Sequence, residues 1–251
     1  MVLLSACSSG ASRSEVEQGI GYIISQEGKD VSEIEKAILE QKLVPVSEDV
    51  EAEDYYERFE GMGIWEKLNS FNTYVAGDSR VETLLYSGLT DGHVKAEKST
   101  TIKVLEEWAE EIGSWNAGVL VLSFGLNDMG MYAFDPDNYW ETGEDYVEAY
   151  KYYIDLIREY SPDTKIMITS IMPVQDFAIE TQERWAAVPQ WNAAIKEFCA
   201  SYGLGYVDAD FITTDYADSF IDDGVHFYGQ EVNDAWGEAI FEAIKEMRIE
   251  V

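Results

Sequence analysis

Three short segments of this 251-residue chain hold the side chains best suited to chemistry. The first contains Ser79, the second Asn127, and the third Asp223 and His226. A serine hydroxyl is a weak nucleophile until a base takes its proton, and histidine is the base suited to neutral pH. A carboxylate can hold the imidazole in one tautomer, and an asparagine amide can donate to the oxyanion formed when an ester carbonyl is attacked. These residue types predict acyl transfer through a serine.

Residues that bind zinc are scarce. The chain has two histidines and two cysteines, so an imidazole mechanism must use His93 or His226. His93 begins a predicted strand outside any motif, and we interpret it as structural. The acidic segment 134–145 lacks the spacing and the glycine of an EF-hand, so we predict no metal site there.

Alternating strand and helix patterns must position these side chains. Short runs rich in Val, Ile, Leu or Tyr predict five strands, at Asn72–Gly77, His93–Glu97, Gly118–Phe124, Lys165–Ser170 and Gly205–Ala209. Helical patterns lie between and after them, at Val81–Ser87, Thr101–Ile112, Glu144–Tyr160, Gln182–Tyr202 and Gly229–Lys245. The alternation predicts an α/β fold, a three-layer α/β/α sandwich with a mostly parallel five-stranded sheet. Sites in such folds lie beyond the carboxyl ends of the strands, where the three segments fall.

The three segments resemble, in order, the sequence blocks of the SGNH/GDSL hydrolase family: Gly77-Asp78-Ser79, Gly125-Leu126-Asn127-Asp128 and Asp223-Gly224-Val225-His226. The resemblance covers residues 69–251 and implies a flavodoxin-like fold and a serine esterase that uses no metal or organic cofactor. It implies that Ser79 is the nucleophile, His226 the base and Asp223 the acid that orients the base. Asn127 and the backbone N–H of Ser79 would donate to the oxyanion.

The chain departs from the family pattern in two places. Thr83 stands where the first block usually ends in glycine. The family's second block supplies a glycine whose N–H completes the oxyanion hole, and Gly88 matches by identity but lies at the wrong end of the sheet. Ser99 follows the second predicted strand at the correct end, and a backbone N–H requires glycine only where the dihedral angles do. We therefore predict that Ser99 is this donor.

Two further residues, one directly after the first block and one at the end of the second, have other expected roles. Arg80 either contacts the substrate or pairs with one of the many carboxylates. Asp128 is interpreted as a residue that caps or ties down its loop.

The charge balance excludes some partners. The chain has 17 basic and 49 acidic residues, a net charge of −32, so nucleic acid is a poor partner. Hydrophobic residues make up 46%, enough for a substantial core. No apolar run approaches the roughly 20 residues needed to span a bilayer.

The first residues predict a bacterial lipoprotein. Leu4-Ser5-Ala6-Cys7 resembles the lipobox, in which cleavage before a cysteine precedes its lipidation. We expect Cys7 to carry a lipid that anchors the protein, outside the cytoplasm, to a bacterial membrane. Residues 1–18 are then a signal remnant and tether, 19–68 an acidic helical lead segment, and 69–251 the catalytic domain.

The sequence thus predicts a serine esterase that cleaves small O-acyl esters. From the expected compartment, its substrates are O-acetyl groups on carbohydrate or cell-envelope glycans. One alternative is an O-acyltransferase that uses the same residues. The other is a non-catalytic, glycan-binding surface lipoprotein. The oligomeric state is not predicted.

Overall fold

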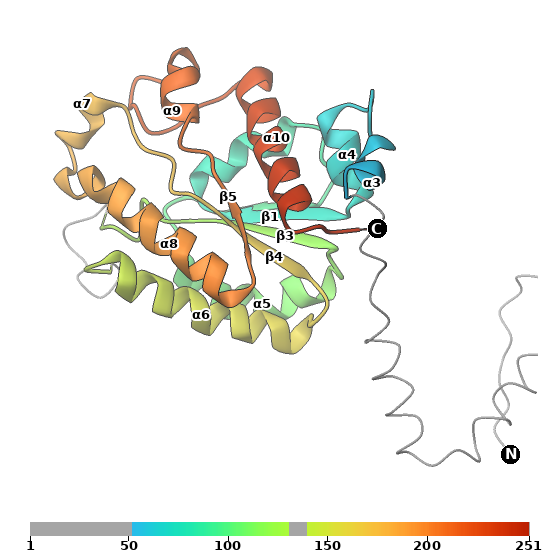
Figure 1. Cartoon of the computed structure of the whole chain (residues 1–251). Coiled ribbons are helices and arrows are strands. Elements are labelled where there is room, and N and C mark those ends of the chain that lie inside the picture. Colours follow the sequence, from blue (N-terminus) through green and yellow to red (C-terminus); the bar gives the residue numbers. More distant parts are fainter. Residues whose placement is uncertain (1–51, 131–139, 251) are drawn as a thin grey trace, which may run out of the picture. The chain divides into compact units, whose positions relative to one another are not determined.

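The computed structural model describes residues 52–130 and 140–250. Five strands form one sheet: β1 (Thr73–Gly77), β2 (Val94–Ala96), β3 (Val119–Ser123), β4 (Lys165–Thr169) and β5 (Gly205–Val207). Their order is β2-β1-β3-β4-β5, and every neighbouring pair is parallel (Figure 1). This is the flavodoxin-like order, in which β2 lies on one side of β1 and the later strands β3, β4 and β5 are added on the other side. The predicted α/β fold and the parallel five-stranded sheet are confirmed.

Helices cover both faces of the sheet, as the alternation of strand side chains requires. In β3, Leu120 and Leu122 pack into one core, whereas Val119 and Val121 pack into the other. The first core is closed by α5 (Leu105–Ser114), α6 (Gly143–Tyr160) and α8 (Val188–Tyr202). The second is closed mainly by α4 (Ile64–Ser70), the 3₁₀ helix η1 (Ser79–Tyr86) and α10 (Gln230–Glu246). Figure 1 shows these two layers on opposite sides of the sheet.

All five predicted strands are present, and each is shorter than predicted. β4 and β5 begin at the predicted residue and end earlier. The helices differ more. The pattern at Val81–Ser87 forms the 3₁₀ helix η1, and Thr101–Ile112 divides into η2 (Ile102–Val104) and α5. The pattern from Gln182 divides into η4 (Glu183–Ala187) and α8, which begins at Val188 with a proline in its first turn. Proline is tolerated there because its missing N–H would have no partner in the helix.

Three short elements were not predicted, because four or fewer residues show no hydrophobic period. They are α7 (Asp176–Ile179), α9 (Ile212–Asp215) and η5 (Ala217–Ser219).

The compact unit that contains the sheet begins at Ala52, before the predicted start of the catalytic domain at residue 69. Helices α3 (Ala52–Glu57) and α4 precede β1, and the buried side chains of Phe59, Ile64 and Leu68 belong to the core beneath α10. Apolar burial therefore joins residues 52–68 to the sheet. The predicted tether, residues 1–18, and residues 19–51 of the predicted lead segment lie outside the described residues.

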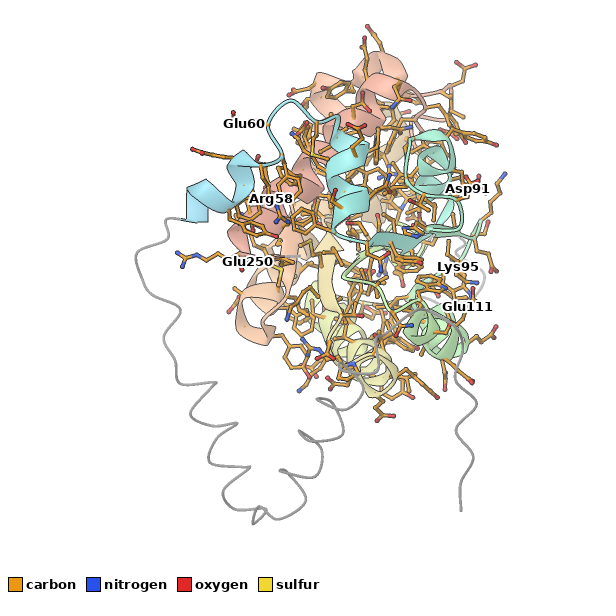
Figure 2. The ribbon with its side chains drawn as sticks, turned by 90° about the vertical axis from the view of Figure 1, so that its right-hand side faces the viewer. Arg58, Glu60, Asp91, Lys95, Glu111 and Glu250 are labelled. Atoms are coloured by element: carbon orange, nitrogen blue, oxygen red, sulfur yellow. The ribbon has the colours of Figure 1, made fainter. Side chains whose placement is uncertain are left out.

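The edge strand β2 is covered by side chains from its surroundings. Lys95 pairs with Glu111 of α5, 2.7 Å away, and the two lie side by side in Figure 2. The ring of His93 stacks on that of Tyr74 at 3.8 Å, and its Nδ1 lies 3.1 Å from the Thr73 carbonyl oxygen. These contacts fit the structural role expected for His93.

No helix among the residues described is long and apolar enough to cross a bilayer. Cys199 is buried in α8, and burial raises the pKa of its thiol to about 12. The thiol therefore behaves as a small buried hydrophobe.

Candidate active site

Ser79 lies on a tight turn at the carboxyl end of β1. Gly77 ends the strand, and a Cβ atom on it would lie 2.2 Å from the carbonyl oxygen of Ser123, so only glycine permits the close approach of β1 and β3. Asp78 then caps η1, because its Oδ1 accepts from the Arg80 N–H at 3.0 Å. Burial raises the pKa of the Asp78 carboxyl. The turn leaves Ser79 half-buried as the first residue of η1.

The structure brings Ser79, His226 and Asp223 together in a hydrogen-bonded chain. Ser79 Oγ lies 2.8 Å from His226 Nε2, and His226 Nδ1 lies 2.7 Å from Asp223 Oδ2. A carboxylate only accepts, so Nδ1 carries the hydrogen donated to Asp223. Nε2 is then free to accept from the Ser79 hydroxyl. The arrangement can remove the hydroxyl proton as the serine attacks.

A local turn holds Asp223 against His226. Asp223 Oδ1 accepts from the backbone N–H groups of Val225, at 2.8 Å, and His226, at 2.9 Å. Partial burial alone would raise the pKa of Asp223, but the hydrogen bonds from the His226 backbone and ring and from Val225 outweigh it and hold this pKa below its usual value. Asp223 is therefore ionised at neutral pH and accepts the Nδ1–H of His226.

The Asn127 loop and the loop after β2 form the other side of the site. The Asn127 amide donates one hydrogen to the Thr100 carbonyl at 2.8 Å, and its second N–H is left for another acceptor. Ser99, next to Thr100, is exposed and has φ +57°. This is the left-handed region that favours glycine, so the backbone here has the conformation that a glycine would adopt most easily.

Gly88 lies away from this loop. Its carbonyl accepts from the Asn69 side chain, just before β1, and a Cβ atom on it would clash with Trp65 of α4. Gly88 is therefore at the amino end of β1, whereas the loop that contains Ser99 passes the carboxyl end, where the Glu97 N–H bonds to the Gly77 carbonyl at 3.2 Å. The assignment of Ser99 as the oxyanion donor stays a prediction.

Comparison with known proteins identifies the family. A family model for the GDSL-like lipase/acylhydrolase family matches residues 73–230, more than half of the chain. The chain belongs to this family. It is therefore an ester hydrolase. No curated protein sequence matches it significantly.

Solved structures share the fold of this acylhydrolase at low sequence identity. A GDSL-like lipase from Parabacteroides merdae has a TM-score of 0.56 and 14% identity, over 70% of this chain and 95% of that one. One from Bacteroides thetaiotaomicron has a TM-score of 0.54 and 16% identity, over 78% and 97%. An acetylxylan esterase from Geobacillus stearothermophilus has a TM-score of 0.51 and 15% identity, over 68% and 93%.

Asp128 ties the Asn127 loop of the acylhydrolase to η2. Its buried Oδ1 accepts from the Ile102 N–H at 2.9 Å, and its backbone carbonyl accepts from the Trp140 N–H. Burial raises the pKa of the Asp128 carboxyl to about 7. The residue therefore has the loop-fastening role expected for it.

Arg80 forms an ion pair with no carboxylate among the described residues. It is buried, at 6% exposure, and its guanidinium donates to the backbone carbonyls of Met172, Pro173 and Val225. Its three acceptors are backbone carbonyls more than 90 residues away in the sequence, so no local pattern could identify them.

Sequence reasoning missed the side chains that support the Asn127 loop from η4 and the preceding turn. Gln182 donates to the Gly130 carbonyl, Arg184 to those of Met129 and Trp140, and the Trp185 indole to that of Leu126 at 3.1 Å. No sequence motif marks these contacts, because they join side chains to carbonyls more than 40 residues away.

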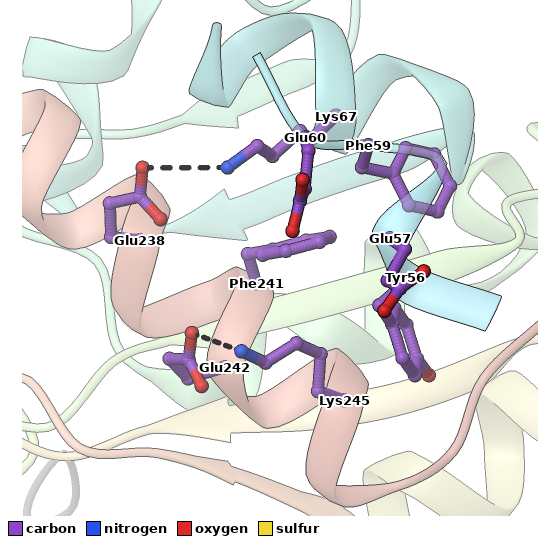
Figure 3. Close-up of a pocket in the computed structure, with 9 residues that line it drawn as sticks. All are labelled: Tyr56, Glu57, Phe59, Glu60, Lys67, Glu238, Phe241, Glu242 and Lys245. Atoms are coloured by element: carbon purple, nitrogen blue, oxygen red, sulfur yellow. Dashed lines mark hydrogen bonds and ion pairs between the residues drawn. The ribbon is translucent and has the colours of Figure 1, made fainter. Parts of the chain in front are cut away.

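A separate cavity of about 570 Å³ lies between α3, α4 and the second half of α10 (Figure 3). It is lined by Tyr56, Glu57, Phe59, Glu60, Lys67, Glu238, Phe241, Glu242 and Lys245. The lysines are paired, Lys67 with Glu238 and Lys245 with Glu242. The lining contains no serine, cysteine or histidine. Across residues 52–130 and 140–250, no cluster of three or more His, Cys, Asp or Glu could hold a metal ion.

Proposed function

We propose that this acylhydrolase is a serine esterase that removes small acyl groups, chiefly acetyl groups, from carbohydrate hydroxyls. The observation that carries the proposal is the hydrogen-bonded chain from Ser79 Oγ through the His226 ring to Asp223, at 2.8 and 2.7 Å. Such a chain has little use in a protein that only binds glycans, because its geometry serves proton transfer.

The first half of the reaction forms an acyl-enzyme. Ser79 Oγ attacks the ester carbonyl carbon while His226 Nε2 takes the hydroxyl proton, and the imidazolium is stabilised by Asp223. The oxyanion receives hydrogen bonds from the free N–H of Asn127 and from the backbone N–H groups of Ser79 and Ser99. When the carbon–oxygen bond to the alcohol breaks, His226 returns the proton to the leaving oxygen.

The second half releases the acid. A water molecule attacks the acyl carbonyl, His226 takes one of its protons, and the same donors hold the oxyanion. The bond to Ser79 Oγ then breaks, and His226 returns the proton to the serine. An acyltransferase would differ only in that a second hydroxyl, rather than water, attacks the acyl-enzyme.

Two observations support a neutral carbohydrate ester as substrate. Structures with the same fold include an acetylxylan esterase from Geobacillus stearothermophilus and a family 3 carbohydrate esterase from Clostridium thermocellum. In addition, a net charge of −32 repels polyanionic substrates and anionic lipid surfaces.

The test is hydrolysis of p-nitrophenyl acetate and of acetylated xylooligosaccharides by a Cys7→Ser chain and by the same chain with Ser79→Ala. We expect turnover that is lost in Ser79→Ala and kept in Ser201→Ala, a matched change of an exposed serine on α8. Free acetate as product supports the esterase, and acetyl transfer to added sugar supports the transferase. A folded wild type without turnover on acetyl or longer esters would contradict both.

We also propose that Cys7, outside the described residues, carries a lipid that anchors the protein outside the cytoplasm. The lipobox-like Leu4-Ser5-Ala6-Cys7 supports this. Incorporation of labelled palmitate that is lost on Cys7→Ser is the expected result. Equal labelling of both chains would refute it.

A further inference from the structure

Arg80 is a buried cation whose side chain donates hydrogen bonds to three backbone carbonyls and lies 6.0 Å from the centre of the Phe227 ring. Its Nε donates to the Val225 oxygen at 3.0 Å, Nη2 to the Pro173 oxygen at 3.3 Å, and Nη1 to the Met172 oxygen. Burial lowers the pKa of Arg80 to about 10, so the side chain stays charged at neutral pH. At 6% exposure, it is too deeply buried to serve as a substrate-binding group.

These three bonds join separate parts of the site. The Arg80 backbone directly follows Ser79 in η1, and Val225 directly precedes His226. Met172 and Pro173 belong to the segment that leaves β4. One side chain therefore connects the nucleophile turn, the segment after β4 and the loop that holds the base.

The loop of His226 also has backbone hydrogen bonds that do not involve η1. The Gln175 N–H donates to the Gly224 carbonyl at 2.8 Å, and the Ile221 N–H donates to the His226 carbonyl at 2.9 Å. Neither bond reaches η1. Ser79 Oγ and His226 Nε2 also connect η1 to this loop, but the Ser79 hydroxyl must lose its proton during the reaction. The hydrogen bond from Arg80 to the Val225 carbonyl is unaffected by the chemistry.

We propose that Arg80 is a positioning residue that holds His226 within hydrogen-bonding distance of Ser79, and so sets the rate of acyl transfer without touching the substrate. The inference rests on the proposed function, in which His226 is the base. A guanidinium suits this task because its planar fork presents several fixed donors, whereas the lysine ammonium is a single point on a flexible stem. Charge-assisted bonds to carbonyls are also stronger than neutral ones.

The test compares Arg80→Lys and Arg80→Met with Thr83→Val as the matched control. Thr83 lies in the same helix η1 and is equally buried, but its hydroxyl donates to Asn233 Oδ1 of α10, at 2.7 Å, and not to the base loop. With p-nitrophenyl acetate we expect kcat to fall about 10- to 100-fold in both Arg80 variants, since misplacement of a reacting group by about 1 Å can cost 10²-fold. KM should stay within about twofold, and Thr83→Val should keep kcat within about twofold.

A second measurement does not depend on turnover. The chain has two histidines, so the low-field proton resonance of the His226 Nδ1–H can be assigned with a His93→Asn chain. We expect it to shift or broaden in Arg80→Lys and Arg80→Met and to be unchanged in Thr83→Val. This readout still tests the positioning role if the wild type cleaves no ester, which would refute the proposed function alone.

Three results would overturn the inference. One is an Arg80→Lys chain that folds, as judged by thermal unfolding, and keeps both kcat and the His226 resonance. Another is an equal loss of kcat in Thr83→Val, which would show a general loosening of η1. The third is a rise in KM with kcat unchanged, which would make Arg80 a binding group. If Arg80→Met does not fold, Arg80→Lys decides, because it keeps the charge and most of the volume.

Discussion

The two loops that flank Ser79 are held by different kinds of interaction. On the base side, Asp223 binds the N–H groups of its own turn and the ring of His226, three residues later. On the oxyanion side, Asn127 and Asp128 bind the backbone of Thr100 and Ile102, 27 and 26 residues away. The base side is thus a local turn, and the Arg80 side chain connects it to η1 through the Val225 carbonyl. The oxyanion side is a contact between two distant loops and depends on the packing around both.

Removal of charge from the base side should have the largest effect. Asp223→Asn keeps the shape of the turn but cannot hold the Nδ1–H tautomer or stabilise the imidazolium. We expect kcat for p-nitrophenyl acetate to fall by about 10³- to 10⁴-fold, as for a comparable change in a serine protease. Asp222→Asn, a change of the neighbouring exposed carboxylate, is the control and should keep kcat. Near-wild-type kcat in Asp223→Asn would show that this carboxylate does not act through His226.

Loss of one donor on the oxyanion side should have a smaller effect. Asn127→Ala removes the free amide N–H and also the bond to Thr100. We expect kcat to fall by about 10²- to 10³-fold, the usual effect of deleting one oxyanion donor. The control is Asn69→Ala, whose amide bonds to the Gly88 carbonyl at the amino end of β1. If the two variants had equal kcat, Asn127 would have no part in the chemistry.

On the oxyanion side, the buried Asp128 should make the stability of the fold depend on pH. Burial raises the pKa of Asp128 to about 7, well above the roughly 3.9 of an exposed aspartate, so the folded protein binds more protons than the unfolded chain between these values. The contribution of Asp128 to stability is therefore full below about pH 4 and is lost as the pH rises towards 7. Asp128→Asn should remove this loss. The free energy of unfolding in urea, taken as variant minus wild type, should therefore increase from pH 5 to pH 8. A constant difference across that range would contradict the shift.

The smallest effect is expected at Ser99. Its φ of +57° costs a non-glycine residue roughly 1–2 kcal/mol, whereas glycine loses roughly 0.5–1 kcal/mol through backbone entropy. Ser99→Gly should therefore raise the unfolding free energy by about 0.5–1 kcal/mol and leave kcat within about twofold, because the backbone N–H remains. A large fall in kcat would assign the role to the hydroxyl instead of the N–H.

The base side and the sheet could be predicted from sequence because both rest on short-range patterns. The strands appear as apolar runs, and the three-residue spacing of Asp223 and His226 indicates that one turn brings the two side chains together. The long-range hydrogen bonds from side chains to backbone carbonyls could not be predicted in this way. Arg80 reaches Val225 across 145 residues, and its partners are carbonyls, which every residue has. Ser99 could be proposed as an oxyanion donor only because the predicted fold places its loop at the carboxyl end of the sheet, and its left-handed φ was not predicted.

The central claim is that His226 activates Ser79, and covalent labelling tests it most directly. Wild type and His226→Ala chains, both carrying Cys7→Ser, would be treated with a fluorophosphonate and analysed by intact mass and by peptide mapping. We predict one adduct in the wild type, on the peptide that contains Ser79, and labelling at least about 100-fold slower in His226→Ala, in line with the usual contribution of a general base. A folded wild type that gains no adduct, gains one on another serine, or reacts equally fast without His226 would contradict the account.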